Sequence, residues 1–345
     1  MIEVHLQRER AVHGAHQVGV QVNGALHCSS PVLGGSSPDQ ADKTTGLCRD
    51  GRWRDHRHRR VLGVIIVVVG LMSAGFVTTL AQTRAREGRA DVPGVRLWYT
   101  DSGGRSAPVV FVHAATGSSR VWEYQLPAFT SGGYRVVTYD RRGFGRSTVD
   151  PVGPQPGTGA DDLLALVNHL GLDRIHLVGT AAGGIVALDF ALSFPQRLRS
   201  LVVANSIGGV QDEDYLELGR RLRPAQFNAL PPDVRELGPS YRAANPKGTA
   251  RWLELESQSR PEGTTPPAQT FRNRLTFALL ETIKTPTLLL TGDADLYAPP
   301  AVLQMFSARI RNAESVIVPE VGHSTYWERP EVFNAKVLEF ISKHP

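Results

Sequence analysis

A short run of small residues between two apolar stretches has the layout of a catalytic turn. Residues 174–178 predict a strand, and residues 185–192 predict the helix that follows. Gly179 and Gly183 flank the central position as in the G-x-S-x-G nucleophile elbow, a turn too tight for bulky neighbours. The central residue is Ala181, and a methyl group cannot attack a substrate. The spacing therefore predicts an elbow whose nucleophile position holds alanine.

Neither alternative register of this turn supplies a better nucleophile. A turn centred on Thr180 needs a small residue at position 178, where the chain has Val178. A turn centred on Ala182 again places a methyl group at the centre. Thr180 offers a hydroxyl beside the elbow, but we expect the turn to point this side chain away from the site.

A histidine and an aspartate later in the chain could supply general-base chemistry. His323 follows an expected strand and stands beside Gly322 on a loop, so its ring can reach the edge of a sheet. Such a base needs a carboxylate that accepts from its second ring nitrogen and orients it. We expect Asp295 in that role, whereas Asp293 could cap the loop instead. Asn205, after another expected strand, cannot serve as the carboxylate.

Several motifs, taken in their order along the chain, resemble those of the α/β-hydrolase fold superfamily. The resemblance covers roughly residues 95–345. Its motifs are Val112-His113-Ala114-Ala115-Thr116-Gly117, Asp140-Arg141-Arg142-Gly143-Phe144-Gly145-Arg146-Ser147, the elbow, Gly292-Asp293-Ala294-Asp295 and Gly322-His323. The first is similar to the HG-x-x-G oxyanion loop of that superfamily, and the second to its D-x-R-G-x-G-x-S turn.

The resemblance implies further roles in the site. The backbone N–H groups of Ala115 and Ala182 would form an oxyanion hole, which needs two convergent donors. Ala114 departs from the glycine that usually follows the histidine, and its Cβ could narrow the loop. Trp122 is expected either to wall the substrate pocket or to anchor the first helix in the core.

Ala181 leaves three explanations of the site open. In the first, alanine replaces a native serine in order to trap substrate, and the unmodified protein hydrolyses esters, lactones or vinylogous C–C bonds. In the second, alanine is native, and His323 with Asp295 activates water or abstracts a substrate proton. Such general-base chemistry contributes roughly 10²- to 10⁴-fold to a rate. In the third, the domain only binds a ligand, which the retained histidine and carboxylate argue against.

The elements that must position these residues alternate regularly from residue 94 onward. Short apolar runs predict strands at 95–100, 109–113, 134–139, 174–178, 198–204, 285–291 and 315–318. Helical patterns lie between strands, including 159–170, and a closing helix is expected at 330–341. This alternation predicts an α/β fold, with a mostly parallel twisted sheet and helices on both of its faces.

The alternation stops between residues 206 and 280. This segment has charged helical faces and proline interruptions, and it is too long for a plain loop. Its aromatic residues argue against the alternative of a disordered insert, because disordered segments are poor in them. We therefore expect an inserted helical cap over the carboxyl ends of the strands.

The N-terminal region differs in character from this domain. Residues 1–51 are polar and without periodicity, which predicts disorder, and a start codon assigned too far upstream is the alternative. Within the segment 52–82, an uncharged apolar run at 61–81 follows a basic flank and predicts a transmembrane signal anchor or a cleaved signal peptide. Residues 83–93 are expected to be a charged linker. Either fate of the apolar run predicts a membrane-anchored or secreted protein with its domain, 94–345, outside the cytoplasm.

Composition argues against several other classes of protein. The net charge is +5, but much of the basic excess lies in the arginine-rich flank before residue 61, so no nucleic-acid partner is expected. The two cysteines, Cys28 and Cys48, both precede the domain, which therefore lacks a thiol nucleophile and a cysteine metal site. We expect no metal and no cofactor, because neither metal-ligand spacing nor a phosphate or dinucleotide loop occurs.

These observations together predict a hydrolase of a small, fairly apolar ester, lactone or related carbonyl compound. The alternatives are a non-hydrolytic ligand-binding protein, and a His/Asp-dependent lyase or cofactor-free oxygenase. The substrate itself and the oligomeric state stay open at this level.

Overall fold

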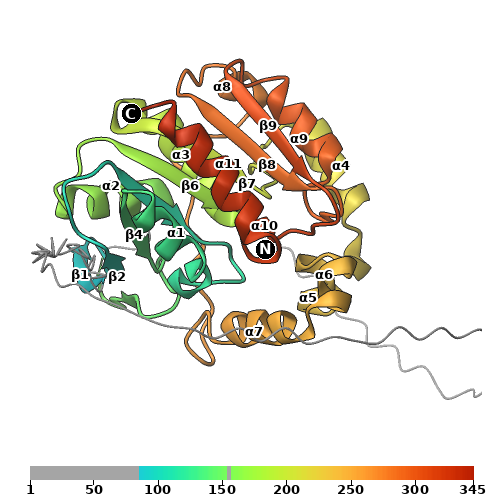
Figure 1. Ribbon diagram of the computed structural model, residues 1–345, viewed down its shortest axis with the longest axis horizontal. Helices are drawn as coiled ribbons and strands as arrows, with labels where there is room; N and C mark the ends of the chain where they lie inside the picture. The colour runs from blue at the N-terminus through green and yellow to red at the C-terminus, as the bar shows by residue number, and fades with distance from the viewer. Residues whose placement is uncertain (1–84, 154–156) are drawn as a thin grey trace, which may run out of the picture. The chain divides into compact units, whose positions relative to one another are not determined.

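The computed structural model describes residues 85–153 and 157–345. The predictions for residues 1–51 and for the apolar run at 61–81 lie outside this part of the chain. Figure 1 shows the described residues as a central sheet with helices in front of it and behind it.

A nine-stranded sheet forms the framework. Its strands are β1 (Arg86–Val92), β2 (Val95–Asp101), β3 (Pro108–Val112), β4 (Arg135–Tyr139), β5 (Thr148–Val149), β6 (Ile175–Thr180), β7 (Leu198–Ala204), β8 (Thr287–Gly292) and β9 (Ala313–Val318). Their order is β1-β2-β4-β3-β6-β7-β8-β9, and β5 pairs with β2. Every pair that involves β2 is antiparallel, whereas the pairs from β4 across to β9 are parallel. The predicted mostly parallel sheet is confirmed.

Apolar strand residues alternate between two hydrophobic cores, one on each face of the sheet. In β3, Val110 and Val112 belong to one core, and Val109 and Phe111 belong to the other. This alternation follows from the two-residue period of a strand, and a strand buried on both faces reads as a continuous apolar run. The sheet is therefore covered on both faces, as expected.

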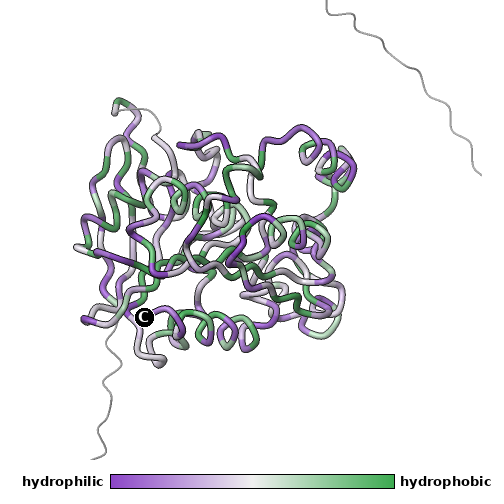
Figure 2. Tube along the Cα trace, turned by 90° about the horizontal axis from the view of Figure 1, so that it is seen from above, coloured by the Kyte–Doolittle hydropathy of each residue, from purple (hydrophilic) through white to green (hydrophobic). Residues whose placement is uncertain are grey.

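Each core is closed by its own set of helices. The first core contains buried residues of α2 (Gly159–His169), α3 (Ala182–Ser193) and α9 (Pro300–Ser307). The second contains buried residues of α1 (Gln125–Ser131), α10 (Thr325–Glu328) and α11 (Pro330–Ser342). Hydrophobic and hydrophilic colours alternate around the turns of helices in Figure 2, as expected for helices with one face on a core.

The segment 206–280 forms a series of short helices. They are α4 (Glu213–Leu222), η3 (Ala225–Ala229), α5 (Pro232–Glu236), α6 (Pro239–Ala244), α7 (Pro246–Ser257) and α8 (Phe277–Leu280). In Figure 1, α5, α6 and α7 lie together at one side of the sheet. The segment reaches the carboxyl ends of the strands, because Arg235 and Glu236 line the same cavity as Ala181, which follows β6.

Most of the expected linker at 83–93 is a strand instead. Residues 86–92 form β1, which pairs with β2 along its whole length. Ala90 is buried and Gly88 and Val92 are half-buried, so alternate residues face inward while charged residues lie between them. The charged residues of an edge strand hid this two-residue period in the sequence.

The localisation predicted from the sequence is corrected here. Among residues 85–153 and 157–345, no helix is both long enough and apolar enough to cross a membrane. The run at 61–81, on which the prediction rested, lies outside these residues. Membrane anchoring and secretion are therefore not retained.

Candidate active site

The turn at Ala181 has the strained backbone of a nucleophile elbow. Ala181 joins β6 to α3 with φ 49° and ψ −116°, a region that costs a non-glycine residue about 1–3 kcal/mol. A Cβ at Gly183 would lie 2.1 Å from the Val112 carbonyl oxygen, so this position requires glycine. The Ala181 N–H donates to the Ala204 carbonyl at 2.9 Å, and the Ser206 hydroxyl donates to the Ala181 carbonyl at 2.7 Å. The surroundings thus hold the elbow although its side chain is a methyl group.

His323 and Asp295 are in direct contact. His323 Nδ1 lies 2.8 Å from Asp295 Oδ1 and 2.9 Å from Oδ2, and both side chains are buried. Burial lowers the pKa of His323, but the charge and hydrogen bond of Asp295 outweigh it and raise that pKa above 6.5. Burial acts to raise the pKa of Asp295, but His323 and the other donors hold it below its usual value. The carboxylate therefore stays charged and orients the ring.

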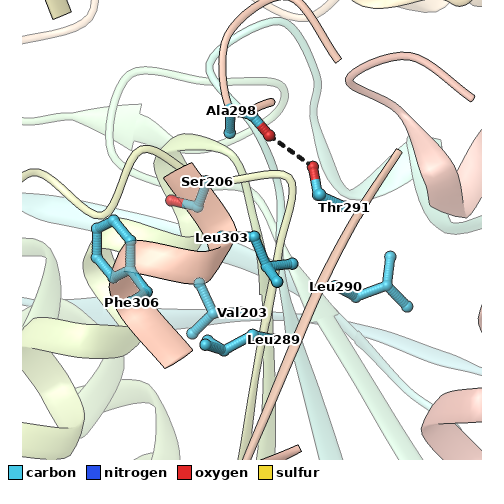
Figure 3. Close-up of a pocket in the computed structure, with 8 residues that line it drawn as sticks. All are labelled: Val203, Ser206, Leu289, Leu290, Thr291, Ala298, Leu303 and Phe306. Atoms are coloured by element: carbon cyan, nitrogen blue, oxygen red, sulfur yellow. Dashed lines mark hydrogen bonds between the residues drawn. The ribbon is translucent and has the colours of Figure 1, made fainter. Parts of the chain in front are cut away.

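The loop that carries Asp295 is fixed by several hydrogen bonds. The N–H groups of Tyr297 and Ala298 donate to Oδ1 of Asp295 at 2.8 and 2.9 Å, and the Asn205 amide donates to Oδ2 at 3.1 Å. Figure 3 shows the Thr291 hydroxyl, in β8, bonded to the Ala298 carbonyl at 2.8 Å. The cavity drawn there holds about 20 Å³, room for one water. These contacts fix the carboxylate in advance of substrate binding.

The two backbone donors expected to form an oxyanion hole lie at one cavity. Ala115 and Ala182 both line the cavity that contains His323. Ala182 is the first residue of α3, where N–H groups have no partner within the helix. Arg260, from the inserted segment, donates to the Ala115 carbonyl at 2.9 Å and lies 3.1 Å from the Glu256 carboxylate. The insert therefore braces the loop that carries one of the donors.

The cavity over the elbow has a volume of about 370 Å³. Strand-end loops and the start of α3 contribute Ala114, Ala115, Thr116, Ala181, Ala182, Ile185, Tyr297 and His323. The inserted segment contributes Ile207, Arg235, Glu236, Glu256 and Arg260. The cavity is therefore lined by both apolar and charged side chains.

Glu236, which the sequence analysis missed, lies beside the histidine. It is 3% exposed, and its backbone carbonyl accepts from the His323 N–H at 2.8 Å. Burial raises the pKa of the Glu236 carboxyl, and the nearby His323 lowers it only in part. The Tyr297 ring lies 4.4 Å from the His323 ring between centroids, and its hydroxyl accepts from Arg235 at 3.2 Å. The sequence around Glu236 is that of a short charged helix, and nothing in it indicates that this residue lies beside the histidine.

Three other residues considered from the sequence lie away from this cavity. Trp122 is 1% exposed and packs against Tyr326, so it anchors the core and does not wall the pocket. Asp293 accepts from the Glu320 N–H at 2.6 Å and fastens the loop. Thr180 is fully buried and does not line the cavity. The site thus comprises the elbow, the two donor loops, Asp295 and His323.

Comparison with known proteins gives a consistent picture. The model of the alpha/beta hydrolase family matches residues 109–336. A protein of Caulobacter sp. (strain K31), named "Putative carbamate hydrolase RutD", is 34% identical over 244 residues, which cover 66% of this chain and 87% of that protein.

Solved structures agree. A thermophilic esterase from Thermogutta terrifontis matches with a TM-score of 0.63 and 28% identity, over 76% of this chain and 100% of its own. Est816, described as an N-acyl homoserine lactone degrading enzyme, matches with a TM-score of 0.58 and 25% identity, over 73% of this chain and 100% of its own. The fold, the order of the motifs and the family match lead to one conclusion: this chain belongs to the alpha/beta hydrolase family and is a probable hydrolase.

Proposed function

We propose that this protein hydrolyses small carbonyl compounds of the ester or lactone type with a water molecule that His323 activates directly. The observation that carries the proposal is an oriented imidazole at a cavity whose nucleophile position holds only the Ala181 methyl group. Among the described residues, no hydrogen bond occupies His323 Nε2. The esterase and the lactone-degrading enzyme among the structural relatives support this substrate class.

The reaction needs only a base and two donors. His323 Nε2 takes a proton from water while the water oxygen attacks the carbonyl carbon, and the resulting imidazolium is stabilised by the Asp295 carboxylate. The N–H groups of Ala115 and Ala182 hold the oxyanion that forms on the carbonyl oxygen. The tetrahedral intermediate then collapses, the alkoxide leaves, and it receives the proton from His323. An ester gives a carboxylic acid and an alcohol, and a lactone gives a single hydroxy acid.

Retention of a strained elbow without a nucleophile supports this use of the site. The backbone turn at Ala181 aims the N–H of Ala182, so an oxyanion donor depends on the strain even when the side chain does not react. A methyl group also leaves more room than a hydroxymethyl group for water between His323 and the substrate. The proposed role of the elbow is therefore to position a backbone N–H group, and not to present a reactive side chain.

The first test removes the base. The substrate is p-nitrophenyl acetate, and His323→Ala is expected to lower its turnover by about 10²- to 10⁴-fold, the usual contribution of a general base. His169→Ala is the matched control, because His169 is exposed and belongs to α2. Equal turnover by wild type and His323→Ala would remove the histidine from the mechanism.

The second test separates water attack from a serine site whose nucleophile was replaced. Under our proposal, wild type forms no covalent acyl-enzyme in mass spectrometry, whereas Ala181→Ser forms one. Loss of a serine nucleophile costs a serine protease on the order of 10⁶-fold in rate. The water mechanism is wrong if wild type shows no turnover that depends on His323 while Ala181→Ser gains several orders of magnitude.

A further inference from the structure

Arg141 carries a guanidinium group without a partner near the active site. Its Nε and Nη2 atoms are covered from solvent and have no hydrogen-bond partner. Across residues 85–153 and 157–345, Arg141 forms no ion pair, although arginines at many other positions do. Burial lowers the pKa of Arg141 to about 10, so the group remains charged near neutral pH. Arg141 is half-buried, and a charge whose nitrogens are partly covered gains from a counter-charge that a ligand can supply.

The position of this guanidinium is fixed by its neighbours. The backbone N–H group of Arg141 donates to Nε2 of His113 at 2.9 Å, which ties the backbone at Arg141 to the oxyanion loop. The guanidinium carbon lies 4.6 Å from the centroid of the Phe144 ring. Stacking on an aromatic ring holds the planar group without using any of its N–H donors. Arg141 is therefore ordered in advance.

Arg141 lines a second cavity, which we call the arginine cavity. It has a volume of about 280 Å³ and also contains Arg142 and Asp189 in its lining. It shares Ala182 and Ile185 with the cavity over the elbow. Ala182 supplies one of the proposed oxyanion donors, so a substrate whose carbonyl lies there could extend a chain toward Arg141.

The acidic groups around the arginine cavity are already occupied. Asp189 accepts from the backbone N–H groups of Arg272 and Asn273 and from the Asn273 amide. Asp162 accepts two hydrogen bonds from Arg142, at 2.7 and 3.0 Å. Asp162 also accepts from the amide of Gln269 at 2.8 Å. Arg142 nevertheless keeps one buried nitrogen, Nη1, without a partner.

The geometry points to a carboxylate-binding subsite in the arginine cavity, so that the substrate is a carbonyl compound whose chain ends in a carboxylate. The planar fork of Arg141 pairs with the two oxygens of that carboxylate, and Nη1 of Arg142 adds one more hydrogen-bond donor. The placement of the carbonyl at Ala182 rests on the proposed function. The binding of the carboxylate itself does not.

The test measures binding by calorimetry with probes that cannot be hydrolysed. The probes are levulinate and its longer methyl-ketone acid homologues, each compared with the neutral methyl ketone of matching length. For the best-fitting acid, Arg141→Gln is expected to weaken binding about 10- to 100-fold, the loss of a charge-assisted pair. The neutral ketones are expected to bind wild type and Arg141→Gln equally.

Two further variants keep the result interpretable. Arg141→Lys retains the charge but loses the fork, and it is expected to bind the acid more weakly than wild type and more tightly than Arg141→Gln. Arg105→Gln removes an exposed arginine and is expected to change nothing. Thermal unfolding of each variant checks that it is folded.

The outcomes separate this inference from the proposed function. If no acid binds more tightly than its ketone, or if folded Arg141→Gln and Arg141→Lys both keep full affinity for it, the subsite does not exist. If the acids bind through Arg141 but ester turnover does not depend on His323, the subsite stands and the proposed chemistry falls.

Discussion

The strand-end loops and the inserted segment line one cavity, but they are held in different ways. Asp295 and His323 stand on loops fixed by buried hydrogen bonds, and the elbow at Ala181 is held by close backbone contacts. The insert instead contributes half-exposed side chains, such as Arg260 and Glu256, that reach in from short helices. From this difference we expect substitutions on the strand-end loops to affect turnover more than substitutions on the insert.

The largest loss of activity is expected from a substitution of Asp295, on the strand-end loops. Asp295→Asn is expected to lower ester turnover by roughly 10³- to 10⁴-fold, because the amide favours the wrong ring tautomer and cannot stabilise an imidazolium. Steady-state kinetics with p-nitrophenyl acetate would measure the loss. Asp293→Asn, two residues away and exposed, is the matched control and should retain nearly full activity. An equal loss in both variants would mean that the loop, and not the carboxylate, matters.

The pH dependence of turnover examines the same pair. His323 acts as a base only when its Nε2 is unprotonated, and Asp295 raises the pKa of His323 above 6.5. The rate should therefore fall as pH drops through an apparent pKa above 6.5, by about 100-fold over the next two pH units. In Asp295→Asn this acid limb should move to lower pH, because the charge that raised the pKa is gone. An acid limb near 4 in wild type would contradict the assignment of His323 as the base.

A substitution in the insert is expected to change turnover least. Arg260→Gln removes the donor to the Ala115 carbonyl and should lower kcat/KM by roughly 10-fold, the value of one charged hydrogen bond. Arg260 is part of a half-exposed ion pair, so the free energy of unfolding should change by less than about 1 kcal/mol. Arg251→Gln on α7 is the control, since Arg251 forms ion pairs with Glu123 and Glu254 and does not line the cavity. A loss as large as that of Asp295→Asn would erase the distinction between the two regions.

Most of the sheet could be predicted because its strands are buried on both faces. The runs at 198–204 and 285–291 contain the apolar stretches Leu201–Ala204 and Leu288–Leu290, and the structure has β7 at Leu198–Ala204 and β8 at Thr287–Gly292. The edge strand β1 was missed because an edge needs charged residues, which resemble a linker. Trp122 was left undecided because a large aromatic residue suits a pocket wall and a core equally well.

The amino-acid sequence by itself determined the order of strands and helices, the glycine-flanked elbow with Ala181 at its centre, and the family. Those features are local, since they depend on the period of apolar residues and on where a Cβ fits. Only the tertiary structure decided that Glu236 lies against His323 and that Arg141 meets no counter-charge among the residues it describes. Both facts depend on segments that are far apart in the sequence and meet only in the folded chain, so the residues adjacent to Glu236 and Arg141 do not reveal them.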